Sequence, residues 1–156
     1  MGRRGLPLAL ALAATVAVAS GITVVAARAL DTDEPPTRAE YLADVEALCA
    51  QYGAELDRIP PPGDLSSPGA IVESLEQALP VLREQERAVK ALQSPPALEA
   101  DLARFFRLTD RSLEELQTAL DEALERALYP MATALTRFDE VRNEAKAVAR
   151  RIGFAC

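Results

Sequence analysis

The chain has 156 residues, of which 49% are hydrophobic, 26% charged and 4% aromatic, and its formal net charge is −7 at pH 7. All 24 acidic residues lie from Asp31 onward, whereas three of the 17 basic residues (Arg3, Arg4 and Arg28) come before it, so the part after residue 30 is strongly acidic. This excludes nucleic acid and anionic lipid surfaces as partners of that part, because basic charge supplies their main attraction. The absence of histidine also excludes imidazole-based catalytic triads and the commonest metal ligand.

Residues 6–27 are an uncharged apolar run preceded by Arg3 and Arg4. As a helix at ~1.5 Å per residue, such a run reaches roughly 33 Å, enough to cross a bilayer core of about 30 Å. The basic residues predict that the N-terminus stays inside and that the rest of the chain lies outside. We expect residues 1–30 to be a single-pass signal-anchor. The alternative is a signal peptide cleaved after Ala19 or Ala29, which would release a secreted protein.

An acidic spacer over residues 31–36 leads into a domain predicted over residues 37–156. Residues 37–40 (TRAE) match a capping box, with a threonine at the N-cap and a glutamate three residues later. Apolar residues spaced by three or four continue from there to Ile59, which predicts a helix of about 22 residues. The helix is expected to end at residues 60–63 (PPPG), because proline and glycine disfavour its continuation.

Ser67-Pro68 is the second helix start, with a serine at the N-cap and a proline at the first helical position. The apolar spacing predicts a helix of about 26 residues that ends before residues 94–96 (SPP). Pro80 lies inside this helix and is expected to kink it, because proline removes one backbone hydrogen bond.

The third and longest helix is predicted from Leu98 over about 31 residues, and Tyr129-Pro130 is expected either to break it or to bend it. A last helix of about 22 residues follows and ends at Gly153, which is suited to a left-handed C-terminal position with Phe154 packing back. Short connections favour antiparallel neighbours. The predicted fold class is therefore all-α, an up-down-up-down four-helix bundle after an N-terminal transmembrane or signal helix.

The only two cysteines are Cys49, midway along the first predicted helix, and Cys156, the last residue. First and last helices are neighbours in an antiparallel bundle, and an exported pair oxidises and persists, so we predict a structural disulfide. The alternatives are two unpaired thiols, a redox-active pair or metal ligation. The last two are disfavoured because no C-x-x-C spacing and no histidine are present.

The cysteines also carry a resemblance. Tyr41, Val45, Leu48 and Cys49, together with residues 152–156 (IGFAC), resemble a loose group of small actinobacterial proteins that are exported or membrane-anchored and helical. In that group an early cysteine pairs with a C-terminal one. The resemblance implies the helical fold and the disulfide, and it implies no activity.

Three sets of side chains are candidate sites. The carboxylates of the third helix favour a solvated face over a calcium site; they are Asp110, Glu114, Glu115, Asp121, Glu122 and Glu125. Two basic stripes favour ion pairing over an anionic ligand or an acidic partner; they are Arg83, Arg87 and Lys90, and Arg104, Arg107 and Arg111. Three phenylalanines favour core packing over a pocket for an apolar ligand; they are Phe105, Phe106 and Phe138.

None of these patterns predicts catalytic, cofactor-binding or metal-binding residues. We therefore expect a non-enzymatic bundle outside the cytoplasm, attached to the membrane through residues 6–27, that contacts an envelope protein. The alternative function is binding of an apolar or amphiphilic small molecule between the helices. An enzyme would need a water-exposed carboxylate pair in which one pKa is raised.

Overall fold

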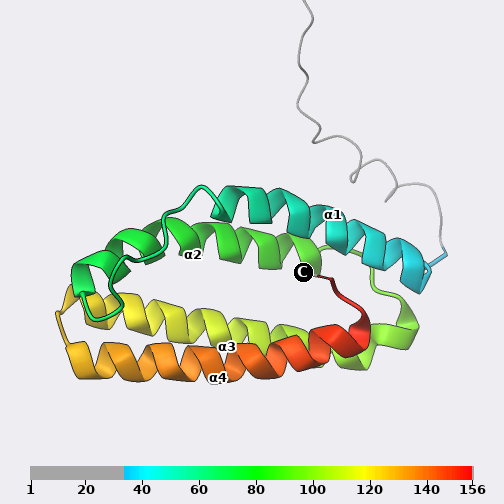
Figure 1. Ribbon diagram of the computed structural model, residues 1–156. Coiled ribbons are helices and arrows are strands. Elements are labelled where there is room, and N and C mark those ends of the chain that lie inside the picture. Colours follow the sequence, from blue (N-terminus) through cyan, green and yellow to red (C-terminus); the bar gives the residue numbers. More distant parts are fainter. Residues whose placement is uncertain (1–33, 156) are drawn as a thin grey trace, which may run out of the picture. The chain divides into compact units, whose positions relative to one another are not determined.

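The structure is a computed structural model that describes residues 34–155, and this part of the chain is helical without any strand (Figure 1). Its elements are α1 (Arg38–Leu56), α2 (Pro68–Lys90), the short 3₁₀ helix η1 (Pro96–Leu98), α3 (Glu99–Leu124) and α4 (Leu128–Ile152). Four long helices pack against one another, which confirms the all-α prediction. The predicted leader over residues 1–30 lies outside the described residues. Within residues 34–155, no helix is long and apolar enough to cross a membrane.

The start of α1 follows the sequence signal closely. Thr37 is the N-cap, its hydroxyl accepts a hydrogen bond from the Glu40 N–H at 3.3 Å, and the Thr37 N–H donates to Glu40 Oε2 at 2.9 Å. This capping box satisfies backbone donors that the first helical turn leaves unpaired. At α2 the predicted start is also confirmed, with Ser67 at the N-cap and Pro68 at the first position, although the Ser67 side chain makes no capping hydrogen bond.

α2 continues without interruption through Pro80. The ring is exposed on the outer side of the helix, whereas the neighbouring Leu79 is buried. Pro80 therefore costs α2 one backbone hydrogen bond on its solvated side and leaves the packed side intact.

The predicted length of the third helix is wrong. α3 ends at Leu124, well before Tyr129-Pro130, and Arg126 adopts a left-handed backbone with a φ of 58°. The Ala127 N–H then donates to the Glu122 carbonyl at 2.9 Å and closes the turn. Pro130 instead lies in the first turn of α4, where a backbone N–H has no intrahelical acceptor to lose. The proline thus starts a helix here and does not end one.

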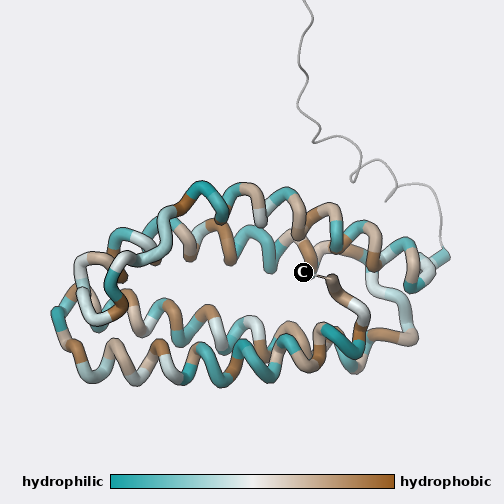
Figure 2. The backbone as a smooth tube through the Cα atoms, viewed as in Figure 1, coloured by the Kyte–Doolittle hydropathy of each residue, from teal (hydrophilic) through white to brown (hydrophobic). Residues whose placement is uncertain are grey.

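The helices pack in sequence order: α1 along α2, α2 along α3 and α3 along α4. In Figure 1, α1 and α2 form one layer and α3 and α4 the other. Figure 2 shows that apolar and polar residues interchange along every helix, as expected when one face is buried and the other solvated. The largest cluster of buried residues joins α1, α2, α3 and α4 around Tyr41, Leu102 and Ile152.

The start of α1 contacts the end of α4. Arg38 Nη2 donates hydrogen bonds to the carbonyl oxygens of Ile152 at 2.8 Å and Arg151 at 3.4 Å. Gly153 follows with a φ of 98°, as predicted, and a Cβ built there would lie 3.3 Å from Leu42 Cδ1. Phe154 then folds back, as expected, and its ring lies 6.3 Å from the ring of Tyr41 and 5.1 Å from that of Phe105.

Candidate functional site

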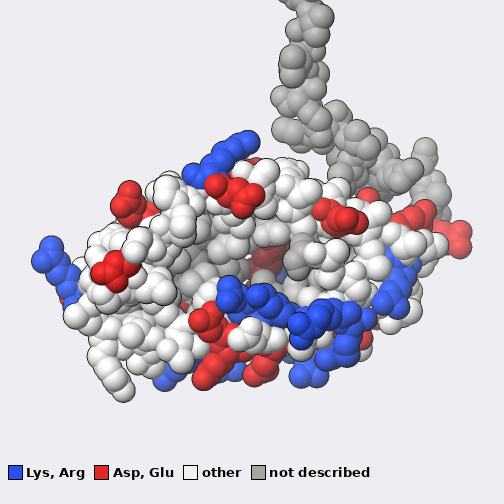
Figure 3. All heavy atoms as spheres, in the orientation of Figure 1, with Lys and Arg blue, Asp and Glu red and all other residues white. Residues whose placement is uncertain are grey.

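A cleft of about 260 Å³ lies between the two layers of helices and is the candidate functional site. All four helices line it, and most of the wall is apolar. The apolar and aromatic side chains that line it are Val45, Leu82, Val89, Phe105, Phe106, Leu113, Leu116, Phe138, Ala145, Ala149 and Phe154. In Figure 3 the face between the layers is hollowed. A mostly apolar cavity between helices is a common place for a small molecule to bind in bundles.

The shape of the cleft follows from the helix packing. α1 packs along α2, and α4 packs along α3, so the side of α1 that faces α4 is left open along the cleft. Ala145 and Ala149 line the cleft from α4, and their short side chains leave space that larger side chains would fill. The lining residues Phe105 and Leu116 stand about 16 Å apart along α3 at ~1.5 Å per residue, so the cleft is elongated along the helix axis.

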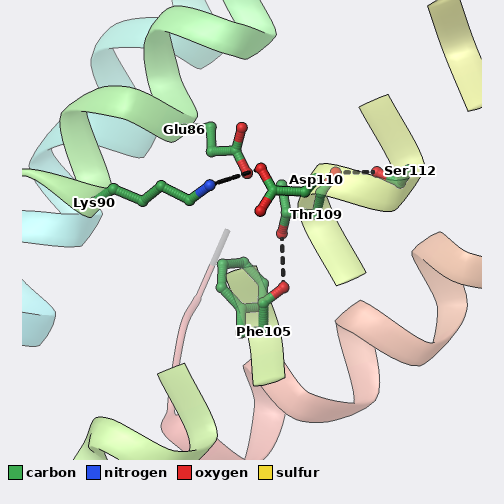
Figure 4. A network of polar contacts seen from close by, with 6 residues as sticks. All are labelled: Glu86, Lys90, Phe105, Thr109, Asp110 and Ser112. Carbon is green, nitrogen blue, oxygen red and sulfur yellow. Dashed lines mark hydrogen bonds and ion pairs between the residues drawn. The ribbon is translucent and has the colours of Figure 1, made fainter. Parts of the chain in front are cut away.

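A network of charged groups joins α2 to α3 (Figure 4), and one of these groups, Glu86, lines the cleft. Lys90 Nζ lies 2.6 Å from Asp110 Oδ1 and 3.1 Å from Glu86 Oε1, and it also lies 5.6 Å from the centre of the Phe106 ring. The Glu86 side chain is only 10% exposed. Its Oε1 atom makes this ion pair but no hydrogen bond within the described residues.

Burial raises the pKa of the Glu86 carboxyl, and the nearby Asp110 adds to the increase, whereas Lys90 acts against it. Burial on its own lowers the pKa of Lys90, but its contacts with Asp110 and Glu86 outweigh burial and raise it. Glu86 and Asp110 come closest to the carboxylate pair that an enzyme would need. Lys90, however, bridges the two groups, and Glu86 is mostly buried and not open to water.

The opposite rim of the cleft is basic. Arg142 and Lys146, one turn apart on α4, are exposed and line the cleft. Arg142 Nη2 lies 3.0 Å from Asp139 Oδ1, and its guanidinium lies 5.2 Å from the centre of the Phe138 ring. Lys146 takes part in no ion pair within residues 34–155. Figure 3 shows basic side chains along the lower border of the hollow, over α4.

The three phenylalanines singled out in the sequence all line the cleft, although they come from two helices. No acidic residue of α3 lines the cleft: Glu114, Asp121 and Glu125 are exposed, and Asp110, also exposed, pairs with Lys90 of α2. Among residues 34–155 no group of acidic or sulfur ligands is arranged to hold a metal ion.

The two basic stripes serve different contacts. On α2, Lys90 bridges to α3 as described, Arg83 Nη2 donates to Gln117 Oε1 at 2.8 Å, and Arg87 pairs with Glu84 at 2.6 Å. The contacts of Arg87 and Lys90 are ion pairs, as predicted, whereas Arg83 binds a neutral amide. The stripe of Arg104, Arg107 and Arg111 on α3 is exposed and lines no part of the cleft.

Cys49 lines the cleft from α1, and its Sγ accepts a hydrogen bond from Gln85 Nε2 at 3.7 Å. Cys156 lies outside the described residues, so the disulfide between Cys49 and Cys156 remains a prediction.

Sequence reasoning missed Glu86, Arg142 and Lys146. Glu86 belongs to a run of charged residues on α2, and neither its burial nor its contact with Asp110 follows from that run. The one available signal is spacing. Phe138, Arg142, Ala145 and Ala149 follow one another at three or four residues, which places Arg142 within this stripe and Lys146 at its edge.

No family model, curated protein or solved structure matches this chain. The resemblance to small actinobacterial exported proteins therefore remains a prediction from its sequence motifs alone.

Proposed function

We propose that this protein binds a small apolar or amphiphilic molecule in the cleft between its four helices. The observation that carries the proposal is the cleft itself, which is elongated, mostly apolar and lined by Phe105, Phe106 and Phe138. Its volume of about 260 Å³ is close to the lower end of the ~300–1,000 Å³ range of small-molecule sites. The role is one of binding without catalysis.

The test is photolabelling of the full chain in phosphatidylcholine nanodiscs with a photoactivatable analogue of dodecanol, followed by peptide mapping. We expect saturable labelling of α3 and α4 peptides that line the cleft. Ala145→Leu fills the cleft from α4 and is expected to abolish this labelling, whereas Ala132→Leu adds the same side chain at an exposed position and is expected to retain it. Ser112→Leu blocks the opposite wall and serves as a second variant if Ala145→Leu fails to fold. Labelling that survives in every folded blocking variant, or no labelling of cleft peptides at all, would overturn the proposal.

A second candidate is contact with an envelope protein. It is favoured by exposed apolar side chains around the α3–α4 connection, where Leu124 is 58%, Leu128 54% and Tyr129 84% exposed. A photoreactive amino acid in place of Tyr129 is expected to yield one defined protein adduct in cells, and Leu128→Ser is expected to remove it. Adducts to lipid alone, or a protein adduct that is unchanged by Leu128→Ser, would contradict this role.

We further propose that residues 1–30 anchor the chain in the cell membrane, with residues 31–36 as a spacer and residues 37–156 outside. Secretion after cleavage is the alternative. The apolar run of residues 6–27 supports the anchor. The mass of the protein from its native host decides between the two, because cleavage removes about 19 or about 29 residues.

For the outer domain we propose an up-down-up-down order of helices, locked by the Cys49–Cys156 disulfide. Packing between consecutive helices and the hydrogen bonds from Arg38 to the end of α4 support this order. Alkylation of thiols before and after reduction tests the disulfide. Two thiols that react without reduction would contradict both the pairing and the compartment.

A further inference from the structure

The cleft offers an occupant two different chemical surroundings. Most of its wall is apolar, with Leu82, Leu113 and Leu116 among the lining residues, so a fully polar molecule would lose hydration there with few polar groups to compensate. Its rim on α4 carries two cations, Arg142 and Lys146. An occupant that satisfies both regions has an apolar chain and a charged end.

The sign of the charged end follows from the pairing of the cations. Lys146 has no ion-pair partner within residues 34–155, although acidic residues outnumber basic ones in the whole chain. Arg142 has one pair, with Asp139, in which both side chains are about half exposed, and an exposed pair of this kind holds its partners weakly. The rim therefore presents positive charge that the protein itself does not neutralise.

The charged residues on the α2 side of the cleft indicate where the anionic end of a ligand would lie. Glu86 lines the cleft from α2. An anionic group near α2 would be repelled by the buried Glu86 carboxylate, and Lys90 already pairs with Glu86 and Asp110. The anionic end is thus favoured at the α4 rim and disfavoured at the α2 wall.

The length of the site limits the number of chains. The lining residues extend about 16 Å along α3 at ~1.5 Å per residue, within one narrow cavity of about 260 Å³. One extended alkyl chain fits this shape, whereas a lipid with two acyl chains does not.

From these four observations we infer that the cleft binds a single-chain amphiphile with a terminal anionic group, held by Arg142 and Lys146 at the rim and by the apolar wall along its chain. This inference rests on the proposed function and names the ligand class for the same site. A free fatty acid and a lysolipid with an anionic headgroup share this chemistry.

The experiment uses the full chain in phosphatidylcholine nanodiscs, labelled in the cleft with the dodecanol analogue. Dodecanoate, dodecanol and dodecyltrimethylammonium then compete for the site, and empty nanodiscs correct for their partition into lipid. We expect dodecanoate to compete about three- to tenfold better than dodecanol, the range for two half-exposed ion pairs, and the cationic amphiphile to compete worst. A lysolipid of the same chain length with an anionic headgroup shows which source of the anionic end binds better.

The variant Arg142→Gln/Lys146→Gln is expected to bring dodecanoate and dodecanol to parity while cleft labelling persists. Arg137→Gln/Arg150→Gln is the matched control, since it removes two exposed charges from α4 that do not line the cleft. Equal competition by dodecanoate and dodecanol in the wild type, or an equal loss of preference in the control, would overturn the anionic ligand but leave the proposed function in place. The absence of cleft labelling would overturn both.

Discussion

Two buried polar groups, the Tyr41 hydroxyl and Glu86 Oε1, have no hydrogen-bond partner among the described residues, and each is expected to affect the stability of the fold. Glu86 Oε1 makes an ion pair only. A buried polar group without a hydrogen bond costs the free energy of its lost hydration. Tyr41 is uncharged at neutral pH, whereas Glu86 is an acidic residue that lines the cleft and pairs with Lys90.

Replacing Tyr41 by phenylalanine is expected to raise the free energy of unfolding by about 1 kcal/mol, because it deletes the unpaired hydroxyl and keeps the ring. Burial also raises the pKa of Tyr41 from 10.0 to about 12. The fold disfavours the ionised phenolate relative to the neutral phenol, so the stability of the wild type is unaffected by this group below pH 10 and falls as the pH rises from 10 through 12.

Thermal unfolding at neutral pH and at alkaline pH measures both effects for Tyr41→Phe. Tyr52→Phe, at a second buried tyrosine of α1, is the control for loss of a hydroxyl. A Tyr41→Phe protein that is less stable than the wild type at neutral pH would show that the hydroxyl has a partner in solution.

Replacing Glu86 by glutamine is expected to change the pH dependence of stability. The raised pKa means that Glu86 favours the folded state at acid pH and that this contribution is lost as the pH rises from 4.5 through the pKa in the fold. The stability of Glu86→Gln relative to the wild type should therefore increase between acid and neutral pH.

Urea unfolding at a series of pH values gives this difference directly. Glu84→Gln removes the same charge from an exposed position on α2 and serves as the control. A difference between Glu86→Gln and the wild type that does not vary with pH would show that the pKa of Glu86 is the same in the folded and unfolded chains.

At the scale of the elements, helix boundaries depend on where backbone hydrogen bonds are lost at least cost. Pro68 and Pro130 lie in the first turns of α2 and α4, where an N–H is not needed. Pro80 lies in the interior of α2, where it removes a hydrogen bond to the carbonyl of Glu76. The left-handed residues Arg126 and Gly153 follow α3 and α4, and only Gly153 is of the residue type usual for that conformation, because glycine has no Cβ.

Pro80→Ala is expected to keep the fold and to raise the free energy of unfolding by about 1–3 kcal/mol, because it restores one helical hydrogen bond on the exposed side of α2. Denaturant unfolding measures the change. Pro68→Ala, at a position that gains no such bond, is the control. A destabilised Pro80→Ala protein would mean that the shape of α2 at Pro80 is required for packing against α3.

At the scale of the whole helical part, two hydrogen bonds join the start of α1 to the end of α4. Arg38 binds the last carbonyl oxygens of α4, 114 residues further along the chain in the case of Ile152. The carbonyl end of a helix carries partial negative charge, so a guanidinium there is favourable. The predicted Cys49–Cys156 disulfide would add a covalent link between the same two parts of the chain.

Arg38→Leu is expected to lower the free energy of unfolding by about 1.5–3 kcal/mol, the usual contribution of hydrogen bonds to a charged group. Arg58→Leu, an exposed arginine that follows α1, is the control. Thermal unfolding of the two variants compares them. Equal effects would show that the hydrogen bonds to Ile152 and Arg151 contribute nothing measurable.

Cys49→Ser is expected to lower the free energy of unfolding of the oxidised protein by up to about 4 kcal/mol, because a disulfide across a long loop restricts the unfolded chain. Cys156→Ser should have the same effect, and a reductant should bring the wild type to the level of both variants. Unchanged melting temperatures in Cys49→Ser would remove the structural disulfide.

Sequence by itself determined the local structure of this protein. The capping box at Thr37, the proline starts and the left-handed Gly153 depend on backbone chemistry within a few residues, and the helical spacing of apolar residues depends on a fixed period, so all were predictable. Tertiary structure decided where the third helix ends and where the cleft lies. Pro130 has opposite effects in a helix interior and in a first turn, and only packing selects between them. The burial of Glu86 and the exposed rim of Arg142 and Lys146 depend on how neighbouring helices approach one another, which no local period encodes.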